Sequence, residues 1–160
     1  MYAALCSRTH ISMQLTFIHV TARRYLSSII ANGLRAGSYL SHADHVEVRE
    51  HLVTDLVHAG HEPVVLVVEP TALDVRHLAA AMEAIEHPMP AVLAKMCCYE
   101  LRDRWDGCSQ TWRDSVELVG VCRHLLPVPA RYLRFEGQPL VGPVKAAKRR
   151  PKARTPGRAP

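Results

Sequence analysis

Three side chains in this sequence are of types that handle nucleotides, and each stands on a segment with the pattern of a β-strand. They are the imidazole of His19, the phenol of Tyr39 and the carboxylate of Glu117. An imidazole can hydrogen-bond a hydroxyl, and an aromatic ring can stack on a flat heterocycle. A fixed carboxylate stabilises the positive charge that develops on a sugar as its glycosidic bond breaks. The three residues together predict a nucleotide-handling site.

The first half of the chain alternates between strand and helix patterns, which places the histidine and the tyrosine on two strands. Branched and aromatic residues predict strands, and apolar residues at helical spacing predict helices. Asn32 and Gly33 tolerate a left-handed backbone and predict the end of the first helix. The branched run between Pro63 and Pro70 predicts a strand that is buried on both faces. In chain order we expect a strand over 15–20, a helix over 21–31, a strand over 38–41, a helix over 43–60 and a strand over 63–69.

The second half of the chain carries the predicted acidic residue on a strand. The pattern leaves open whether Ser115 or Glu117 faces the site, because the register of this strand is not fixed by the sequence. The expected elements are a helix within 75–85, a break at 87–90, a helix within 92–105, a strand over 116–122 and a closing strand over 132–135.

Length and charge divide the chain into one domain and two terminal segments. With 160 residues, of which 48% are hydrophobic and 22% charged, the chain has the size and composition of a single globular domain. We expect an N-terminal extension over 1–14, a domain over 15–143 and a tail over 144–160. The tail holds seven of the 20 Lys and Arg residues and no acid, so the rest carries 13 basic residues against 15 acidic ones. Such a tail is expected to be disordered and to offer salt-dependent contacts to nucleic acid.

Neither a membrane nor a metal is expected as a partner. No apolar run approaches the roughly 20 residues that span a bilayer, and no secretory signal is evident, so we expect a cytoplasmic protein. The five cysteines include no C-x-x-C pair, which predicts free thiols. The histidines of the central region lack the Cys or carboxylate partners of a familiar ligand set, so we expect them on the surface. They are His42, His45, His58 and His61.

The order of the short motifs resembles that of the ADP-ribosyltransferase superfamily, which includes diphtheria-toxin-like transferases, DNA-modifying toxins of the DarT type and RNA 2'-phosphotransferases. The similarity covers most of residues 15–135 and is weaker over 63–73 and 117–133. It implies an α+β fold with two small packed β-sheets and intervening helices. The matching stretches are His19-Val20-Thr21, Gly33-Leu34 and Gly37-Ser38-Tyr39-Leu40-Ser41.

The resemblance implies a reaction as well as a fold. It implies that NAD is the substrate and that ADP-ribose passes to a macromolecular acceptor, either nucleic acid or protein. In that scheme His19 binds the nicotinamide ribose, Tyr39 stacks on the nicotinamide and Glu117 steadies the oxocarbenium ion. Thr21 and Ser38, which stand beside them in the motifs, complete the implied NAD-binding set.

Two other functions are compatible with the same motifs. A noncatalytic module could keep the fold and bind nucleic acid or protein through its cleft or its tail. An RNA 2'-phosphotransferase-like enzyme would need basic groups for a 2'-phosphate, and Arg23, Arg24 and Arg35 stand near the matching segments. Similarity of fold does not decide among the three.

Overall fold

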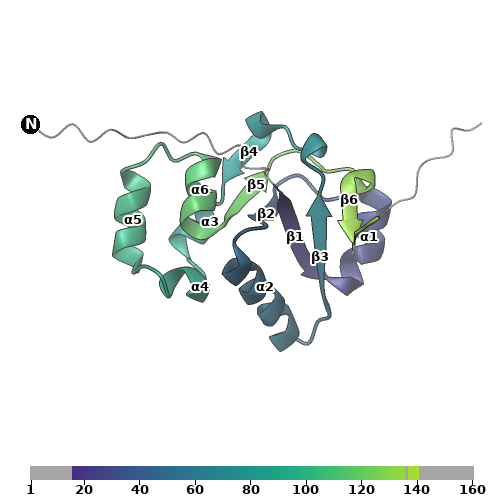
Figure 1. The fold of residues 1–160 in the computed structure, drawn as a ribbon, viewed down its shortest axis with the longest axis horizontal. Helices are drawn as coiled ribbons and strands as arrows, with labels where there is room; N and C mark the ends of the chain where they lie inside the picture. The colour runs from purple at the N-terminus through teal and green to yellow at the C-terminus, as the bar shows by residue number, and fades with distance from the viewer. Residues whose placement is uncertain (1–15, 136, 141–160) are drawn as a thin grey trace, which may run out of the picture.

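The structure is a computed structural model that describes residues 16–135 and 137–140, in which an antiparallel β-sheet is flanked by helices (Figure 1). The described strands follow one another across the sheet in the order β4-β5-β2-β1-β3-β6-β7. The α+β class expected from the sequence is therefore confirmed. The strands are β1 (Phe17–Ala22), β2 (Ser38–His42), β3 (Pro63–Val68), β4 (Leu78–Ala80), β5 (Val121–His124), β6 (Leu133–Phe135) and β7 (Gln138–Pro139).

Helices cover the sheet unevenly. Figure 1 shows α3 to α6 grouped beside β4 and β5, with α1 at the opposite end beside β6. Between these groups α2 packs against β1 and β3. The helices are α1 (Leu26–Asn32), α2 (Val46–His58), α3 (Met82–Glu86), α4 (Pro90–Leu93), α5 (Cys98–Asp106) and α6 (Trp112–Val119), with 3₁₀ turns at Arg23–Tyr25, Pro70–Ala72, Val75–His77 and Ala130–Tyr132.

The expectation of two sheets is wrong, because β1 and β2 join the strands into one. Their junction is short: it contains the pairs Phe17–His42 and Ile18–Ser41, whereas β1 and β3 are paired from Phe17 to Ala22. Beyond Ile18 the backbones of β1 and β2 are no longer paired. There the imidazole of His19 hydrogen-bonds to the main chain of β2, at the carbonyl oxygen of Tyr39. The two halves of the sheet thus share a narrow connection.

The apolar core contains two clusters of buried side chains. In the first, Val64, Leu66 and Val68 of β3 are at most 1% exposed, while Val65 and Val67 are half-buried. The strand is therefore fully buried on one face only. The prediction from the branched run, that both faces are buried, is wrong. The first cluster includes Phe17, Leu40, Leu66 and Leu133, and the second includes Leu101, Trp105, Leu118 and Val119.

The predicted strand over 116–122 is wrong, because most of this segment belongs to helix α6. The helix begins with a capping box, in which Thr111 and Asp114 each bind the backbone amide of the other. It ends where Gly120 adopts a left-handed backbone with φ of +76°. Strand β5 then starts at Val121. Strong local capping thus overrides the β-propensity of the valines.

Other predicted boundaries also shift. The first strand continues through Ala22, so α1 begins at Leu26 and ends before Gly33 as expected. The helix expected within 75–85 is divided into a 3₁₀ turn, strand β4 and the short helix α3. The helix expected within 92–105 is divided into α4 and α5. The extension over 1–14 and the basic tail over 144–160 lie outside the described residues, and within the described part no helix has the length and apolar character to cross a bilayer.

The turn after α1 generates the first prediction. Gly33 has φ of +74°, and a Cβ atom there would overlap the carbonyl oxygen of Val128. Both Leu34–Val128 backbone hydrogen bonds depend on this close approach. We expect Gly33→Ala to lower the free energy of unfolding by about 3 kcal/mol, since backbone strain and overlap act together.

Gly60 is the matched control. It also has φ of +74°, but a Cβ atom there would meet nothing within 4 Å. Gly60→Ala should therefore show only the left-handed penalty of about 1 kcal/mol. Urea unfolding of the two variants measures the difference, and equal losses would show that the Val128 contact does not limit the turn.

Candidate functional site

A cavity of about 370 Å³ lies where β1 and β2 part, between the sheet and helices α2 and α3. We call it the central cleft. Most of its wall is apolar, and polar groups come from four residues. The apolar residues are Ile18, Val20, Leu52, Ala84, Met89 and Val121, and the polar ones are His19, Tyr39, Ser41 and Glu83. The structure thus brings together the predicted histidine and tyrosine.

His19 is held in one tautomer by the backbone of β2. Its Nδ1 lies 2.9 Å from the carbonyl oxygen of Tyr39. A carbonyl oxygen only accepts hydrogen bonds, so Nδ1 carries the proton and Nε2 has a free lone pair. Burial lowers the pKa of His19 below its ordinary value of 6.5, and the bond to Tyr39 opposes this with a smaller effect. Near pH 7, Nε2 is therefore an acceptor for a hydroxyl group.

Tyr39 presents a neutral phenol at the mouth of the central cleft. Its side chain is accessible, since the residue is 42% exposed. The guanidinium of Arg123, its cross-strand partner on β5, lies 5.5 Å from the centroid of the ring. Burial raises the pKa of Tyr39, the neighbouring Glu83 carboxylate raises it further, and Arg123 acts in the opposite direction. The phenol therefore stays protonated at physiological pH.

Glu83 is a candidate site residue that the sequence analysis missed. Its Oε1 lies 3.2 Å from the Nη1 of Arg123, whose Nε donates to the carbonyl oxygen of Gly37 at 3.3 Å. The pKa of Glu83 is lowered, first by its own backbone N–H, then by the Tyr39 hydroxyl and finally by Arg123. A single glutamate in an ill-defined helical segment carries no sequence signal. Its role becomes visible only when α3 is placed against β2 and β5.

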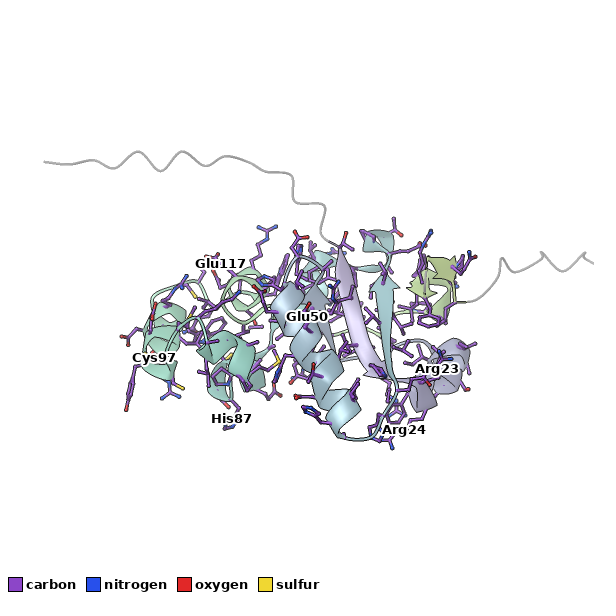
Figure 2. The ribbon with its side chains drawn as sticks, turned by 60° about the horizontal axis from the view of Figure 1, so that its bottom comes forward. Arg23, Arg24, Glu50, His87, Cys97 and Glu117 are labelled. Carbon is purple, nitrogen blue, oxygen red and sulfur yellow. The ribbon has the colours of Figure 1, made fainter. Side chains whose placement is uncertain are left out.

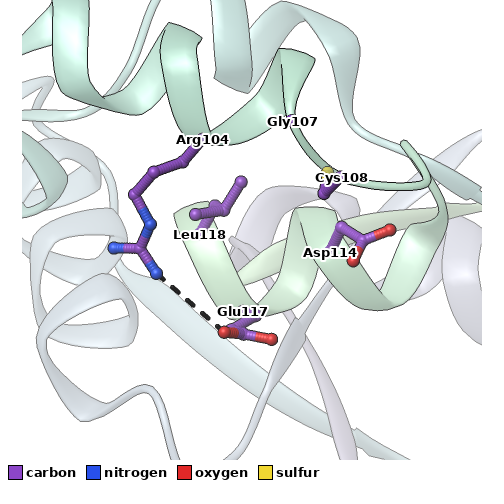
Figure 3. Close-up of a pocket in the computed structure, with 6 residues that line it drawn as sticks. All are labelled: Arg104, Gly107, Cys108, Asp114, Glu117 and Leu118. Atoms are coloured by element: carbon purple, nitrogen blue, oxygen red, sulfur yellow. Dashed lines mark ion pairs between the residues drawn. The ribbon is translucent and has the colours of Figure 1, made fainter. Parts of the chain in front are cut away.

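The structure does not bring Glu117 to the central cleft. Glu117 lies on α6, with its side chain 75% exposed, and lines a different cavity beside Cys108 and Asp114 (Figure 3). Its Oε1 is 4.0 Å from the Nη2 of Arg104. In Figure 2 Glu117 lies toward the same end as Cys97, away from Arg23 and Arg24. The strand assumed for this residue is absent from the described chain, because the segment is helical.

Ser115, the other residue that could have faced the site, is part of the core. It is fully buried, and its hydroxyl donates to the Val121 carbonyl oxygen at 2.7 Å and accepts from the Ala81 amide at 3.0 Å. These bonds tie α6 to β5 and to the segment before α3. Ser115 therefore supports the wall of the cleft without lining it.

A second cavity, of about 360 Å³, lies on the α1 side of His19. We call it the α1 cavity. Ser38 lines it and donates its hydroxyl to the Arg35 carbonyl oxygen at 2.7 Å. Thr21, which pairs with Val64 of β3, lines neither this cavity nor the central cleft. The other polar residues of the α1 cavity are Tyr25, Ser28, Asn32 and Arg35.

The histidines depart in part from their expected surface positions, and the cysteines differ from one another in burial. His42, expected on the surface, is 1% exposed, as is His124, and the Nε2 atom of each has no hydrogen-bond partner in the described structure. Within the described residues, no group of three or more His, Cys, Asp or Glu side chains could hold a metal ion. Burial raises the pKa of the Cys122 thiol to about 12, whereas Cys97 and Cys98 are exposed.

Comparison of the chain with protein-family models, with curated proteins and with solved structures gave no match. The geometry of the two cavities is therefore the basis on which function is assigned. Its main element is His19, which lines both of them.

The environment of His19 generates a pH prediction. The folded state disfavours the imidazolium, so the NMR titration of His19 should give a pKa below 6.5. Stability should decrease as the pH falls below 6.5, because protonation then favours the unfolded chain, in which the pKa is ordinary. His19→Asn, which cannot titrate but keeps a donor for the Tyr39 carbonyl, should show a weaker loss of stability on acidification. A His19 pKa at or above 6.5 would contradict this account.

Proposed function

We propose that the central cleft binds NAD and breaks its nicotinamide–ribose bond, so that ADP-ribose passes to a macromolecular acceptor, either nucleic acid or protein. The observation that carries the proposal is the meeting of His19 and Tyr39 in one cavity at the point where β1 and β2 part. These are the two residues for which the motifs imply contact with the nicotinamide and its ribose. The remaining support comes from the shape and polarity of the cavities.

The central cleft suits a flat ring with a polar edge. Ile18, Leu52 and Met89 are apolar groups that can pack on the faces of such a ring, and Tyr39 can stack on it at the mouth of the cleft. A nicotinamide ring in NAD is also cationic, which favours a site with an aromatic face and the carboxylate of Glu83. A mostly apolar pocket with a few fixed polar groups is typical of small-molecule sites.

The α1 cavity suits the other part of a dinucleotide. It shares the lining residue His19 with the central cleft, and we propose that one extended ligand contacts His19 from both cavities. Arg35 offers positive charge for a phosphate, and Ser28 and Asn32 add polar side chains. In this arrangement the free Nε2 of His19 accepts a hydrogen bond from a ribose hydroxyl near the middle of the ligand.

The reaction is a displacement at the anomeric carbon of the ribose. The bond between this carbon and the nicotinamide nitrogen breaks, and both electrons go to the nitrogen, so nicotinamide leaves as a neutral molecule. A nucleophilic oxygen or nitrogen of the acceptor forms the new bond and releases its proton to solvent. Positive charge builds up on the ribose between these events, and the site must stabilise this charge.

One observation supports each of the two alternative functions. The position of Glu117 outside the central cleft favours a noncatalytic module that binds nucleic acid or protein. The position of Arg35 in the α1 cavity is compatible with an RNA 2'-phosphotransferase-like enzyme. For that enzyme the other two arginines are less suitable, because Arg23 pairs with Glu62 and Arg24 stacks on Tyr25.

Release of nicotinamide from NAD by the full chain tests the proposal. We expect wild-type protein to bind NAD in calorimetry and to release nicotinamide, with faster release when nucleic acid or cell protein is added. His19→Ala should weaken NAD binding about 2- to 10-fold, the range expected for one lost hydrogen bond, and should lower the release further.

His58→Ala is the control, since His58 is exposed at the end of α2 and lines neither cavity. It should bind and release as the wild type does. A folded wild-type sample that binds no NAD, or equal activity in both variants, would contradict the proposed function.

A further inference from the structure

We propose that Glu83, and not Glu117, supplies the carboxylate that stabilises the ribosyl cation during NAD cleavage. This inference rests on the proposed function and specifies the acid of that site. Among the described residues that line the central cleft, Glu83 is the one acidic residue, and His19 and Tyr39 line the same cavity. Glu117 lines a separate cavity between α6 and the C-terminal end of α5.

Glu83 is anchored, although its side chain is 58% exposed. Its Oε1 is 3.2 Å from the Nη1 of Arg123. The same guanidinium donates through Nε to the carbonyl oxygen of Gly37, at the start of β2. Arg123 thereby connects the carboxylate on α3 to β2, which carries Tyr39, and to its own strand β5. An anion held in this way needs little reorganisation when charge develops nearby.

The anchor lies close to Gly37, the first residue of the motif that contains Tyr39. Gly37 has φ of +79°, and a Cβ atom there would lie 2.9 Å from the Nη2 of Arg123. A larger residue at this position would displace the guanidinium from its place beside Tyr39 and Glu83. The absence of a side chain at Gly37 therefore leaves room for the guanidinium.

Tyr39 connects Glu83 to the predicted ring-binding position. The carboxylate and the phenol line the same cavity, and Arg123 contacts both, since it pairs with Glu83 and lies over the Tyr39 ring. A ring stacked on Tyr39 therefore places its attached ribose within the field of Glu83. As the glycosidic bond breaks, positive charge passes from the ring to the ribose, and a carboxylate in a partly apolar cleft stabilises this charge without any proton transfer.

The test compares three glutamine variants of the full chain in NAD binding and in nicotinamide release with water as the acceptor. We expect Glu83→Gln to bind NAD within about 3-fold of the wild type but to release nicotinamide about 100-fold more slowly, the scale of a lost electrostatic contact in a transition state. Glu86→Gln removes a charge from the same helix, and Glu117→Gln removes the acid that the motifs predicted. Both should retain wild-type release.

A second substitution separates catalysis from folding. Glu83→Asp keeps the charge and should restore part of the release, with an unfolding temperature similar to that of Glu83→Gln. Rescue of activity without a change in stability would exclude a merely structural role for Glu83.

Each other outcome would contradict either the role of Glu83 or the proposed function. Wild-type release that persists in Glu83→Gln would overturn the role of Glu83 and leave the proposed function intact. Loss of release in Glu117→Gln alone would assign the acid to Glu117. A folded wild-type protein that neither binds nor cleaves NAD would overturn the proposed function, and the role of Glu83 with it.

Discussion

The narrow pairing of β1 with β2 is the constraint on which the site depends. Two residue pairs join these strands, and the third position is taken by a side-chain bond, from His19 to the backbone of Tyr39. The central cleft lies where this ladder ends, and the bond from His19 orients the imidazole at the edge of that cavity.

Arg123 fixes the position of neighbouring groups at the other side of the cleft, as the bond to Tyr39 does for His19. A half-buried arginine with one carboxylate, one carbonyl oxygen and one aromatic ring as neighbours is well satisfied, so its position is defined. Through it the short helix α3 is fixed to the strands. The second apolar cluster supports this arrangement from behind, because Ala81 and Ile85 of the α3 region pack with Trp105 and Val119. Polar contacts at the rim of the central cleft and apolar contacts below it thus both hold helix α3 in place.

The sequence predicted the elements with strong local signals and failed where the signals conflicted. The segments around His19 and Tyr39 were predicted as strands because branched and aromatic residues are bounded by clear stop signals. At 116–122 the valines favoured a strand, but the cap at Thr111 and the left-handed Gly120 set the helix ends instead. The placement of α3 could not be predicted, since it depends on long-range contacts, such as the Ala81–Ser115 bond, that leave no local pattern. For this reason the histidine and tyrosine of the candidate site were predictable and its carboxylate was not.

The position of the central cleft across the β1–β2 junction has a thermodynamic consequence. One wall of the central cleft belongs to β1 and the other to β2 and β5, which lie on opposite sides of the short junction. A ligand that touches both walls adds its binding free energy to the few bonds that hold these two parts together. A bound molecule then acts as an additional connection between the strands, at the place where the sheet has the fewest bonds of its own. Ligand binding and the stability of the sheet are therefore thermodynamically linked.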